Sequence, residues 1–191
     1  MANKPLDTTL LDRAIIFAVR AHAGTERRGK GYPYIVHPLE AVSIAATMTA
    51  DQELLAAAAL HDTVEDTDVT VEQIKAEFGE RVANLVADES DRVFEGVSKE
   101  DSWYDRKRDA INRLSKADRD AKIVALGDKL SNMRGIARVY AVQGDTLWNL
   151  FHVKKREAHE WHFRGLADAL RELDGTFAFQ EFEQLINQVF N

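Results

Sequence analysis

The sequence contains no cysteine. A disulfide framework, a thiolate nucleophile and a cysteine-based zinc site are therefore excluded, and nothing indicates an oxidising compartment. Any bound metal must be held by histidine, aspartate or glutamate side chains. The sequence also lacks an apolar run of the roughly 20 residues that cross a bilayer, and its first residues lack the apolar centre of a signal peptide. We therefore predict a cytoplasmic protein without membrane contact.

Proline is rare and occurs only at positions 5, 33 and 38, so the backbone permits helix throughout the chain after residue 38. Apolar residues recur there at helical spacing. With 191 residues, 45% of them hydrophobic and 30% charged, the chain is long enough to bury one substantial core. We predict an all-α fold of about eight to ten helices, in a single domain over residues 1–191. The expected helices lie at about 9–23, from 37, 52–64, 70–78, 81–87, 103–114, 121–142, 147–173 and 177–190.

Positive charge is in deficit, because the formal net charge is -7. A general nucleic-acid binder needs a basic face that neutralises many phosphates, so we predict no nucleic-acid partner. A small polyanionic ligand would instead require a local basic pocket.

A cluster of polar residues, His61-Asp62-Thr63-Val64-Glu65-Asp66, ends an alanine-rich apolar segment. On a helix, residues four apart lie above one another, so His61 would stack with Glu65 and Asp62 with Asp66. If His61 and Asp62 hold a metal, the two following carboxylates lie one turn away. From there one of them could accept a proton from an attacking water.

Two further candidate ligands lie in apolar surroundings. His37 follows a glycine-rich loop, and Asp128 interrupts the most apolar predicted helix, where an uncompensated carboxylate would be costly. Taken alone, His37 is better explained as a residue at a helix start or in a loop. Asp128 alone is equally well explained as the partner of a neighbouring basic residue. Together with His61 and Asp62 they form a mixed nitrogen and oxygen set that suits Mn²⁺, Fe²⁺, Zn²⁺ or Mg²⁺. The spacing does not choose among these metals.

At these residues the sequence resembles the hydrolase domain of the RelA/SpoT proteins, and especially the stand-alone small alarmone hydrolases of the HD superfamily. The matching motifs are RGKGYPYIVHP at 28–38, LHDTVEDT at 60–67, the Phe-Gly pair at 78–79 and GDKLSNMR at 127–134. They occur in the family's order and spacing and cover about residues 20–140. The C-terminal helices at 146–191 are similar but less specific. The resemblance implies an HD-type helical bundle.

The resemblance also implies an activity, the hydrolysis of the 3′-pyrophosphate of (p)ppGpp to GDP or GTP and pyrophosphate, usually with Mn²⁺. It implies metal-ligand roles for His37, His61, Asp62 and Asp128. It implies the role of a catalytic acidic pair for Glu65 and Asp66, without saying which is the general base.

The implied substrate contacts rest on weaker signals. Arg28 matches a loop residue that packs on the guanine ring, a role suited to a planar guanidinium, and Asn132 matches a position near the ribose. Lys107, Lys155 and Lys30 are candidate phosphate ligands, although such basic runs are more commonly solvated surface. We interpret the remaining aromatic and histidine side chains of interest as packing residues: His22, Trp148, His159, Trp161 and His162.

The sequence departs from the family pattern at Gly29, at residues 88–91 and at Gly135. These changes leave the candidate metal ligands intact. They put in doubt how the protein binds the base and the phosphates of a nucleotide substrate. Two alternatives therefore stay open: a generic HD nucleotidase or phosphatase, and a catalytically silent nucleotide-binding regulator. The acidic pair argues against the regulator, which has no need to move protons. Because 191 residues leave no room for synthetase or regulatory domains, we expect hydrolysis alone. The sequence does not predict an oligomeric state.

Overall fold

The structure is a computed structural model that describes residues 6–27, 31–90, 98 and 101–191. Within these residues the chain forms ten α-helices and two short 3-10 helices, and no strand. The prediction of an all-α fold is therefore confirmed. No helix in this part of the chain has the length and apolar character that crossing a membrane requires. The helices are α1 Thr9–Ala21, α2 Val36–Ala45, α3 Gln52–Leu60, α4 Thr63–Asp66, α5 Val71–Phe78, α6 Glu80–Glu89, α7 Trp103–Lys116, α8 Arg119–Gln143, η1 Gly144–Leu150, α9 Arg156–Ala169, η2 Arg171–Leu173 and α10 Phe177–Phe190.

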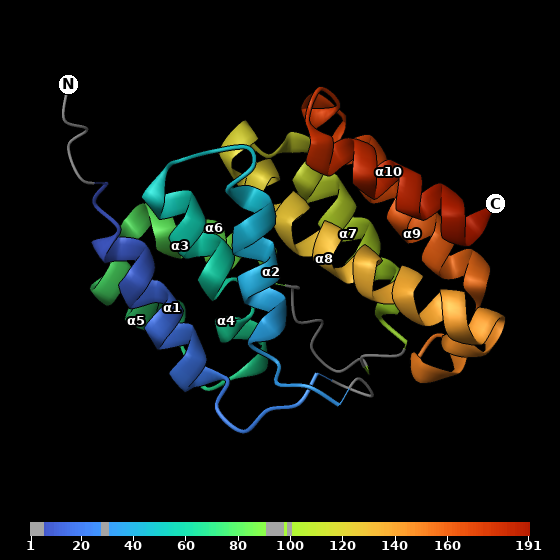
Figure 1. Ribbon diagram of the computed structural model, residues 1–191, viewed down its shortest axis with the longest axis horizontal. Helices are drawn as coiled ribbons and strands as arrows, with labels where there is room; N and C mark the ends of the chain where they lie inside the picture. The colour runs from blue at the N-terminus through green and yellow to red at the C-terminus, as the bar shows by residue number, and fades with distance from the viewer. Residues whose placement is uncertain (1–5, 28–30, 91–97, 99–100) are drawn as a thin grey trace.

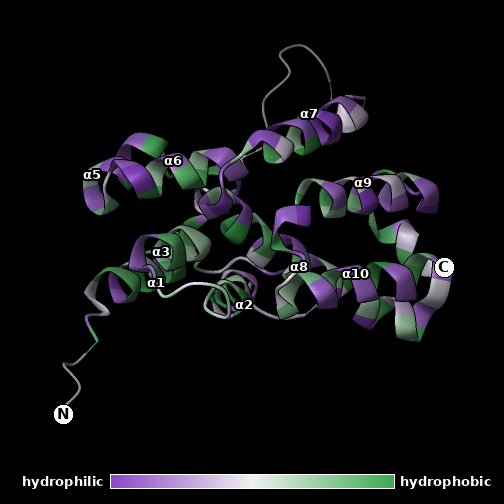
Figure 2. Cartoon of the chain, turned by 90° about the horizontal axis from the view of Figure 1, so that it is seen from above, coloured by the Kyte–Doolittle hydropathy of each residue, from purple (hydrophilic) through white to green (hydrophobic). Residues whose placement is uncertain are grey.

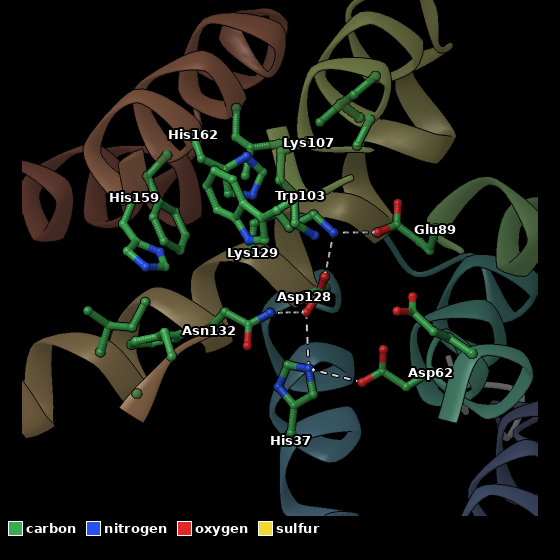
Figure 3. Close-up of a pocket in the computed structure, with 18 of the residues that line it drawn as sticks. His37, Asp62, Glu89, Trp103, Lys107, Asp128, Lys129, Asn132, His159 and His162 are labelled. Atoms are coloured by element: carbon green, nitrogen blue, oxygen red, sulfur yellow. Dashed lines mark hydrogen bonds and ion pairs between the residues drawn. The ribbon is translucent and has the colours of Figure 1, made fainter. Parts of the chain in front are cut away.

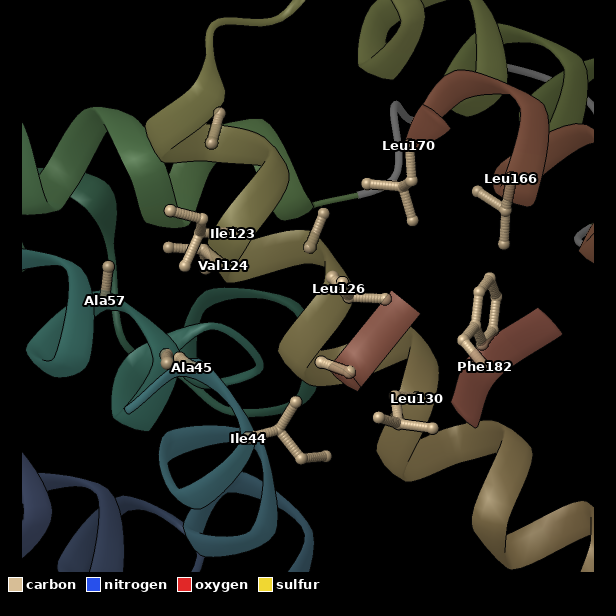
Figure 4. Close-up of a cluster of buried hydrophobic side chains, with 14 of the residues drawn as sticks. Ile44, Ala45, Ala57, Ile123, Val124, Leu126, Leu130, Leu166, Leu170 and Phe182 are labelled. Atoms are coloured by element: carbon tan, nitrogen blue, oxygen red, sulfur yellow. The ribbon is translucent and has the colours of Figure 1, made fainter. Parts of the chain in front are cut away.

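The long helix α8 lies at the centre of the fold and packs against α2, α3, α6, α7 and α10 (Figure 1). Asp118 caps its first turn by accepting a hydrogen bond from the backbone of Ala121, and Gly144 ends it with a φ of 54°. Leu126 and Leu130 are fully buried, and Figure 4 shows them in one cluster with Phe182 of α10. Seen from above in Figure 2, α5, α6 and α7 lie on one side of the molecule and α1, α2 and α10 on the other.

The helices α2 and α8 pack tightly against each other at Gly127. A Cβ atom added at this position would lie 2.8 Å from the carbonyl oxygen of Ala41 in α2. Real Cβ atoms essentially never come this near to a backbone oxygen. Glycine therefore lets two helices pack at a distance that alanine would not allow.

We predict that Gly127→Ala lowers the free energy of unfolding by about 1–3 kcal/mol, because overpacking outweighs the helix propensity that alanine adds. Urea unfolding measures the change. Gly165→Ala is the matched control, since its Cβ would meet the end of the Ile111 side chain, which can move away. Equal stabilities of the two variants would contradict this account of the α2 and α8 contact.

The helix predicted at 52–64 is divided in two, because α3 ends at Leu60 and α4 begins at Thr63. Two side chains take the carbonyl groups at the end of α3. The Thr63 hydroxyl donates to the Leu60 carbonyl at 2.7 Å, and His61 Nδ1 lies 2.9 Å from the Ala58 carbonyl. Such side-chain bonds compete with the helical ladder and end it. The prediction that His61 stacks with Glu65 and Asp62 with Asp66 on one helix is therefore only partly met. The Asp66 amide donates a helical hydrogen bond to the Asp62 carbonyl at 3.0 Å.

The single helix predicted at 147–173 is also wrong. The chain forms η1, a non-helical stretch at 151–155, α9 and then η2. Trp148 is buried and donates its indole N–H to Asp145 at 3.1 Å, which fixes the turn before the stretch. The Val153 carbonyl lies 2.7 Å from His159 Nε2, so the stretch folds back onto α9.

Candidate metal centre

Four side chains from three parts of the chain meet in the interior, and Figure 3 shows three of them, His37, Asp62 and Asp128. His37 comes from the first turn of α2, His61 and Asp62 from the turn between α3 and α4, and Asp128 from the middle of α8. The Nε2 atoms of the two histidines are 3.2 Å apart. Asp62 Oδ2 lies 3.3 Å from the first and 3.0 Å from the second, and Asp128 Oδ1 lies 3.0 and 3.5 Å from them.

The fold explains why these distant residues converge. The close approach of Gly127 to Ala41 lies beside Asp128 and brings the middle of α2 close to the middle of α8. The helix α3 packs against both of these helices, so the turn that follows α3 places His61 close to His37 and Asp128. Both histidines are buried, with 3% of His37 and 2% of His61 exposed.

Hydrogen bonds fix the tautomer of both histidines. The Ala58 carbonyl can only accept, so His61 must carry a proton on Nδ1. The Ser131 hydroxyl donates to Glu40 at 2.7 Å, so its oxygen accepts from His37 Nδ1 at 2.8 Å. In the neutral form each imidazole therefore turns an Nε2 lone pair towards the two carboxylates, which is the orientation of a metal ligand.

The carboxylates keep their charge at this buried point. Burial raises the pKa of Asp62, but His61 and His37 outweigh it and hold the pKa well below its usual range. Burial likewise raises the pKa of Asp128, and Lys129 and the two histidines reverse that effect. Burial lowers the pKa of His61, and Asp62 and Asp128 raise it well above its ordinary value. The histidine Nε2 atoms thus face the buried negative charge of Asp62 and Asp128, which a metal cation or protons must balance.

This donor set fits a divalent metal ion. His37, His61 and Asp128 each offer one ligand atom within 4.8 Å of the others, which lets the three hold one ion. Asp62 adds a second carboxylate oxygen in contact with both imidazoles. Two neutral imidazoles and two carboxylates carry two negative charges, and this mixed set is typical of first-row divalent metals and Mg²⁺.

Asp128 is held in place by its neighbours on α8 (Figure 3). Asn132 donates to Asp128 Oδ1 at 2.5 Å, and the Lys129 ammonium contacts Asp128 Oδ2 at 2.5 Å and Glu89 of α6 at 3.0 Å. Burial lowers the pKa of Lys129, but Asp128 and Glu89 raise it well above the ordinary value. The neighbouring cation considered as an alternative partner for Asp128 is therefore present, and it occupies the carboxylate oxygen that faces away from the histidines.

Tyr34 belongs to this site, although the sequence analysis missed it. Its hydroxyl lies 2.8 Å from Asp62 and 2.6 Å from Asp66, and can donate to one of them at a time. Burial raises the pKa of Tyr34 and Asp62 raises it further, so the phenol stays neutral. Its ring lies between the His22 ring at 4.8 Å and the Arg27 guanidinium at 4.8 Å. The available signal was its position three residues before His37, inside the first matching motif.

The centre opens onto a cavity of about 750 Å³, a size typical of small-molecule sites. Figure 3 shows Trp103, Lys107, His159 and His162 across the cavity from His37 and Asp62. Side chains that line it include Arg27, Tyr34, Asp62, Glu65, Asp66, Trp103, Lys107, Lys129, Asn132, His159 and His162.

The candidate substrate contacts divide into three groups. Lys107 and Asn132 line the cavity, as do His159 and His162, which the sequence analysis treated as packing residues. Lys155 lies just before α9. It is not one of the described residues that line the cavity. Arg28 and Lys30 lie outside the described residues. The neighbouring Arg27 donates to Asn132 at 2.5 Å, so at least one cation of this loop reaches the cavity.

The HD domain family matches residues 14–151 of the chain. Among curated proteins, a mouse (Mus musculus) guanosine-3′,5′-bis(diphosphate) 3′-pyrophosphohydrolase, MESH1, is 33% identical over 180 residues, covering 91% of this chain and 89% of the mouse protein. A guanosine-3′,5′-bis(diphosphate) 3′-pyrophosphohydrolase of Aquifex aeolicus (strain VF5) is 36% identical over 163 residues, or 82% of this chain. The chain spans only 20% of the length of that second relative.

Solved structures share the fold over nearly the whole chain. A metazoan ortholog of SpoT that hydrolyses ppGpp superposes with a TM-score of 0.76 at 25% identity, covering 97% of this chain and 98% of the other. The protein lmo0812 from Listeria monocytogenes EGD-e gives a TM-score of 0.70 at 27% identity, covering 84% of this chain and 97% of the other.

Proposed function

This chain belongs to the HD domain family, and we propose that it is a metal-dependent hydrolase that removes the 3′-pyrophosphate of (p)ppGpp. The products are GDP or GTP and pyrophosphate. The observation that carries the proposal is the convergence of His37, His61, Asp62 and Asp128 beside a cavity large enough for a nucleotide. The mouse relative supports the substrate, because it is named for this reaction and the match covers most of both chains.

We propose Mn²⁺ as the metal held by His37, His61, Asp62 and Asp128. Such an ion, when bound, supplies a Lewis acid that draws charge from phosphate oxygens and makes a water molecule more acidic. The protein's part is to orient the ligands. The contacts of Ser131, Ala58 and Lys129 hold them in a geometry that needs little rearrangement on binding.

We assign the proton transfer to Glu65 and Asp66. The attacking water forms a bond to the phosphorus that carries the 3′ oxygen, and the bond from phosphorus to the 3′ oxygen breaks. One of the two carboxylates accepts the proton that the water loses and, once protonated, a carboxyl group of the pair gives a proton to the departing 3′ oxygen, which becomes a hydroxyl. Both carboxylates border the cavity, and the Tyr34 hydroxyl at 2.6 Å orients Asp66.

The remainder of the nucleotide lies along the cavity in this proposal. Asn132, beside Asp128, is suited to the ribose, and Lys107 to phosphate oxygens. Arg28 and Lys155 remain candidate contacts from the sequence. The charge of Lys129 adds to the attraction for an anion near the centre.

Product analysis separates this function from that of a generic nucleotidase. Metal-reconstituted protein is incubated with ppGpp and, in parallel, with guanosine 5′-diphosphate 3′-monophosphate, and the products are separated by anion-exchange chromatography. We expect pyrophosphate and GDP from the first substrate, little turnover of the second, and loss of activity after treatment with EDTA. Release of orthophosphate from either substrate, or full activity in EDTA, would contradict the proposal. Nucleotide binding without turnover would favour the silent regulator.

A further inference from the structure

A chain of hydrogen bonds leads from His37 away from the candidate metal centre. His37 Nδ1 lies 2.8 Å from the Ser131 hydroxyl, which in turn donates to Glu40 Oε2 at 2.7 Å. His37 and Glu40 lie one turn apart on α2, and Ser131 faces them from α8. His37 and Ser131 are buried, with 3% and 4% of their surfaces exposed, so bulk water does not replace this partner.

Two arginines hold Glu40 from the other side. Arg134 and Arg138 of α8 contact Glu40 Oε1 at 3.3 and 3.0 Å. Burial raises the pKa of Glu40, but the Ser131 hydrogen bond and the two arginines outweigh it and lower the pKa below its ordinary value. Glu40 is therefore a carboxylate that can only accept hydrogen bonds. Arg134 also pairs with Glu181 of α10, at 2.7 and 2.6 Å.

We propose that Glu40 is a positioning residue of the metal centre, which acts through Ser131 to keep the His37 proton on Nδ1 and the Nε2 lone pair free for a metal ion. The inference rests on the metal site of the proposed function. It adds that metal binding by His37 depends on Glu40, a residue outside the set of candidate ligands.

The argument follows from the single proton of a serine hydroxyl. While Glu40 takes that proton, the Ser131 oxygen can only accept from His37 Nδ1. Without the carboxylate, the hydroxyl is free to rotate and to donate to Nδ1 instead. That bond would favour the tautomer with its proton on Nε2, which cannot bind a metal ion through Nε2, the nitrogen that faces the centre. A change in Glu40 thus reaches the ion although no atom of Glu40 touches it.

The test is the affinity for Mn²⁺, measured by calorimetric titration of the EDTA-treated full chain with MnCl₂ in the absence of nucleotide. We expect Glu40→Gln and Ser131→Ala each to weaken binding by about 10- to 100-fold, the usual cost of losing an outer partner of a ligating histidine. In Glu40→Gln the amide oxygen faces the arginines and its NH₂ group faces Ser131, which forces the hydroxyl to donate towards His37. Ser131→Thr keeps the hydroxyl and should bind Mn²⁺ within about 3-fold of the unmodified chain.

A double variant distinguishes relayed positioning from general damage. If Glu40 acts only through Ser131, the combined Glu40→Gln and Ser131→Ala variant should lose no more affinity than Ser131→Ala alone. Glu181→Gln is the matched control, because it removes a partner of Arg134 and leaves the Ser131 link intact. Thermal unfolding in EDTA reports whether each variant is folded. The inference is overturned if the single variants bind Mn²⁺ as the unmodified chain does, if their losses add, or if Glu181→Gln loses as much. The Mn²⁺ titration contains no nucleotide. It therefore still tests the role of Glu40 if the product assay shows that the chain does not hydrolyse ppGpp.

Discussion

Asp128→Asn should reduce Mn²⁺ affinity by more than the roughly 10- to 100-fold that the loss of an outer partner costs, with a parallel loss of phosphohydrolase activity. The substitution keeps the shape of the side chain and removes the charge that a divalent ion needs. It also leaves the Lys129 ammonium at the edge of the site with one carboxylate partner fewer, since the group that it contacts at 2.5 Å becomes a neutral amide. Without the negative charge of Asp128, the Lys129 ammonium repels a metal cation at the centre. Calorimetric titration with MnCl₂ measures the effect.

Asp120→Asn is the matched control for this variant. Asp120 lies on the same helix and pairs with Arg81 at 2.6 Å, away from the candidate metal ligands. We expect its Mn²⁺ affinity to equal that of the unmodified chain. An Asp128→Asn protein that is folded and binds Mn²⁺ with unchanged affinity would remove Asp128 from the ligand set.

Glu65→Ala should lower turnover by about 10²- to 10⁴-fold, the usual contribution of a positioned general acid or base, while Mn²⁺ still binds. The reason is that Glu65 borders the same cavity as Asp62 but is not among the four side chains that converge. Steady-state kinetics with ppGpp give kcat, and metal titration of the same preparation shows whether the centre is intact. Asp66→Asn, measured in parallel, decides which of the two carboxylates is the stronger contributor.

Glu72→Ala serves as the control for this pair, because Glu72 is an exposed carboxylate in the first turn of α5. Its kcat should be unchanged. If Glu65→Ala and Asp66→Asn both keep full turnover, neither carboxylate moves the proton. A loss of Mn²⁺ binding in Glu65→Ala would instead give this residue a role in holding the metal.

The helical architecture was predictable from local rules. The absence of proline after Pro38 and the 3.6-residue periodicity predicted nearly every helix. The structure also shows a capping box formed by Thr70 and Gln73 at the start of α5, and their spacing in the sequence is typical of one. The break after Leu60 was not predictable in this way. It depends on where the His61 ring points, and the tertiary contacts of that ring with His37 are not encoded in local propensity.

The candidate ligands illustrate a different limit. Adjacency in the sequence connected His61 with Asp62, and apolar surroundings pointed to His37 and Asp128. The family resemblance then implied the same four residues as ligands. The structure brings the four together through the packing of α2, α3 and α8, including the close approach of Gly127 to Ala41, and these residues are far apart in sequence. Their role as ligands stays a prediction. Tyr34 and Glu40 were missed because each acts through a neighbour, at distances that only a folded chain defines.

The most direct test is anomalous X-ray diffraction from crystals of the protein grown with MnCl₂, with data collected near the manganese absorption edge. The proposal predicts one strong peak per chain, bounded by His37 Nε2, His61 Nε2 and one oxygen each of Asp62 and Asp128. A map without a peak at that point, or with the only peak elsewhere on the chain, would contradict it.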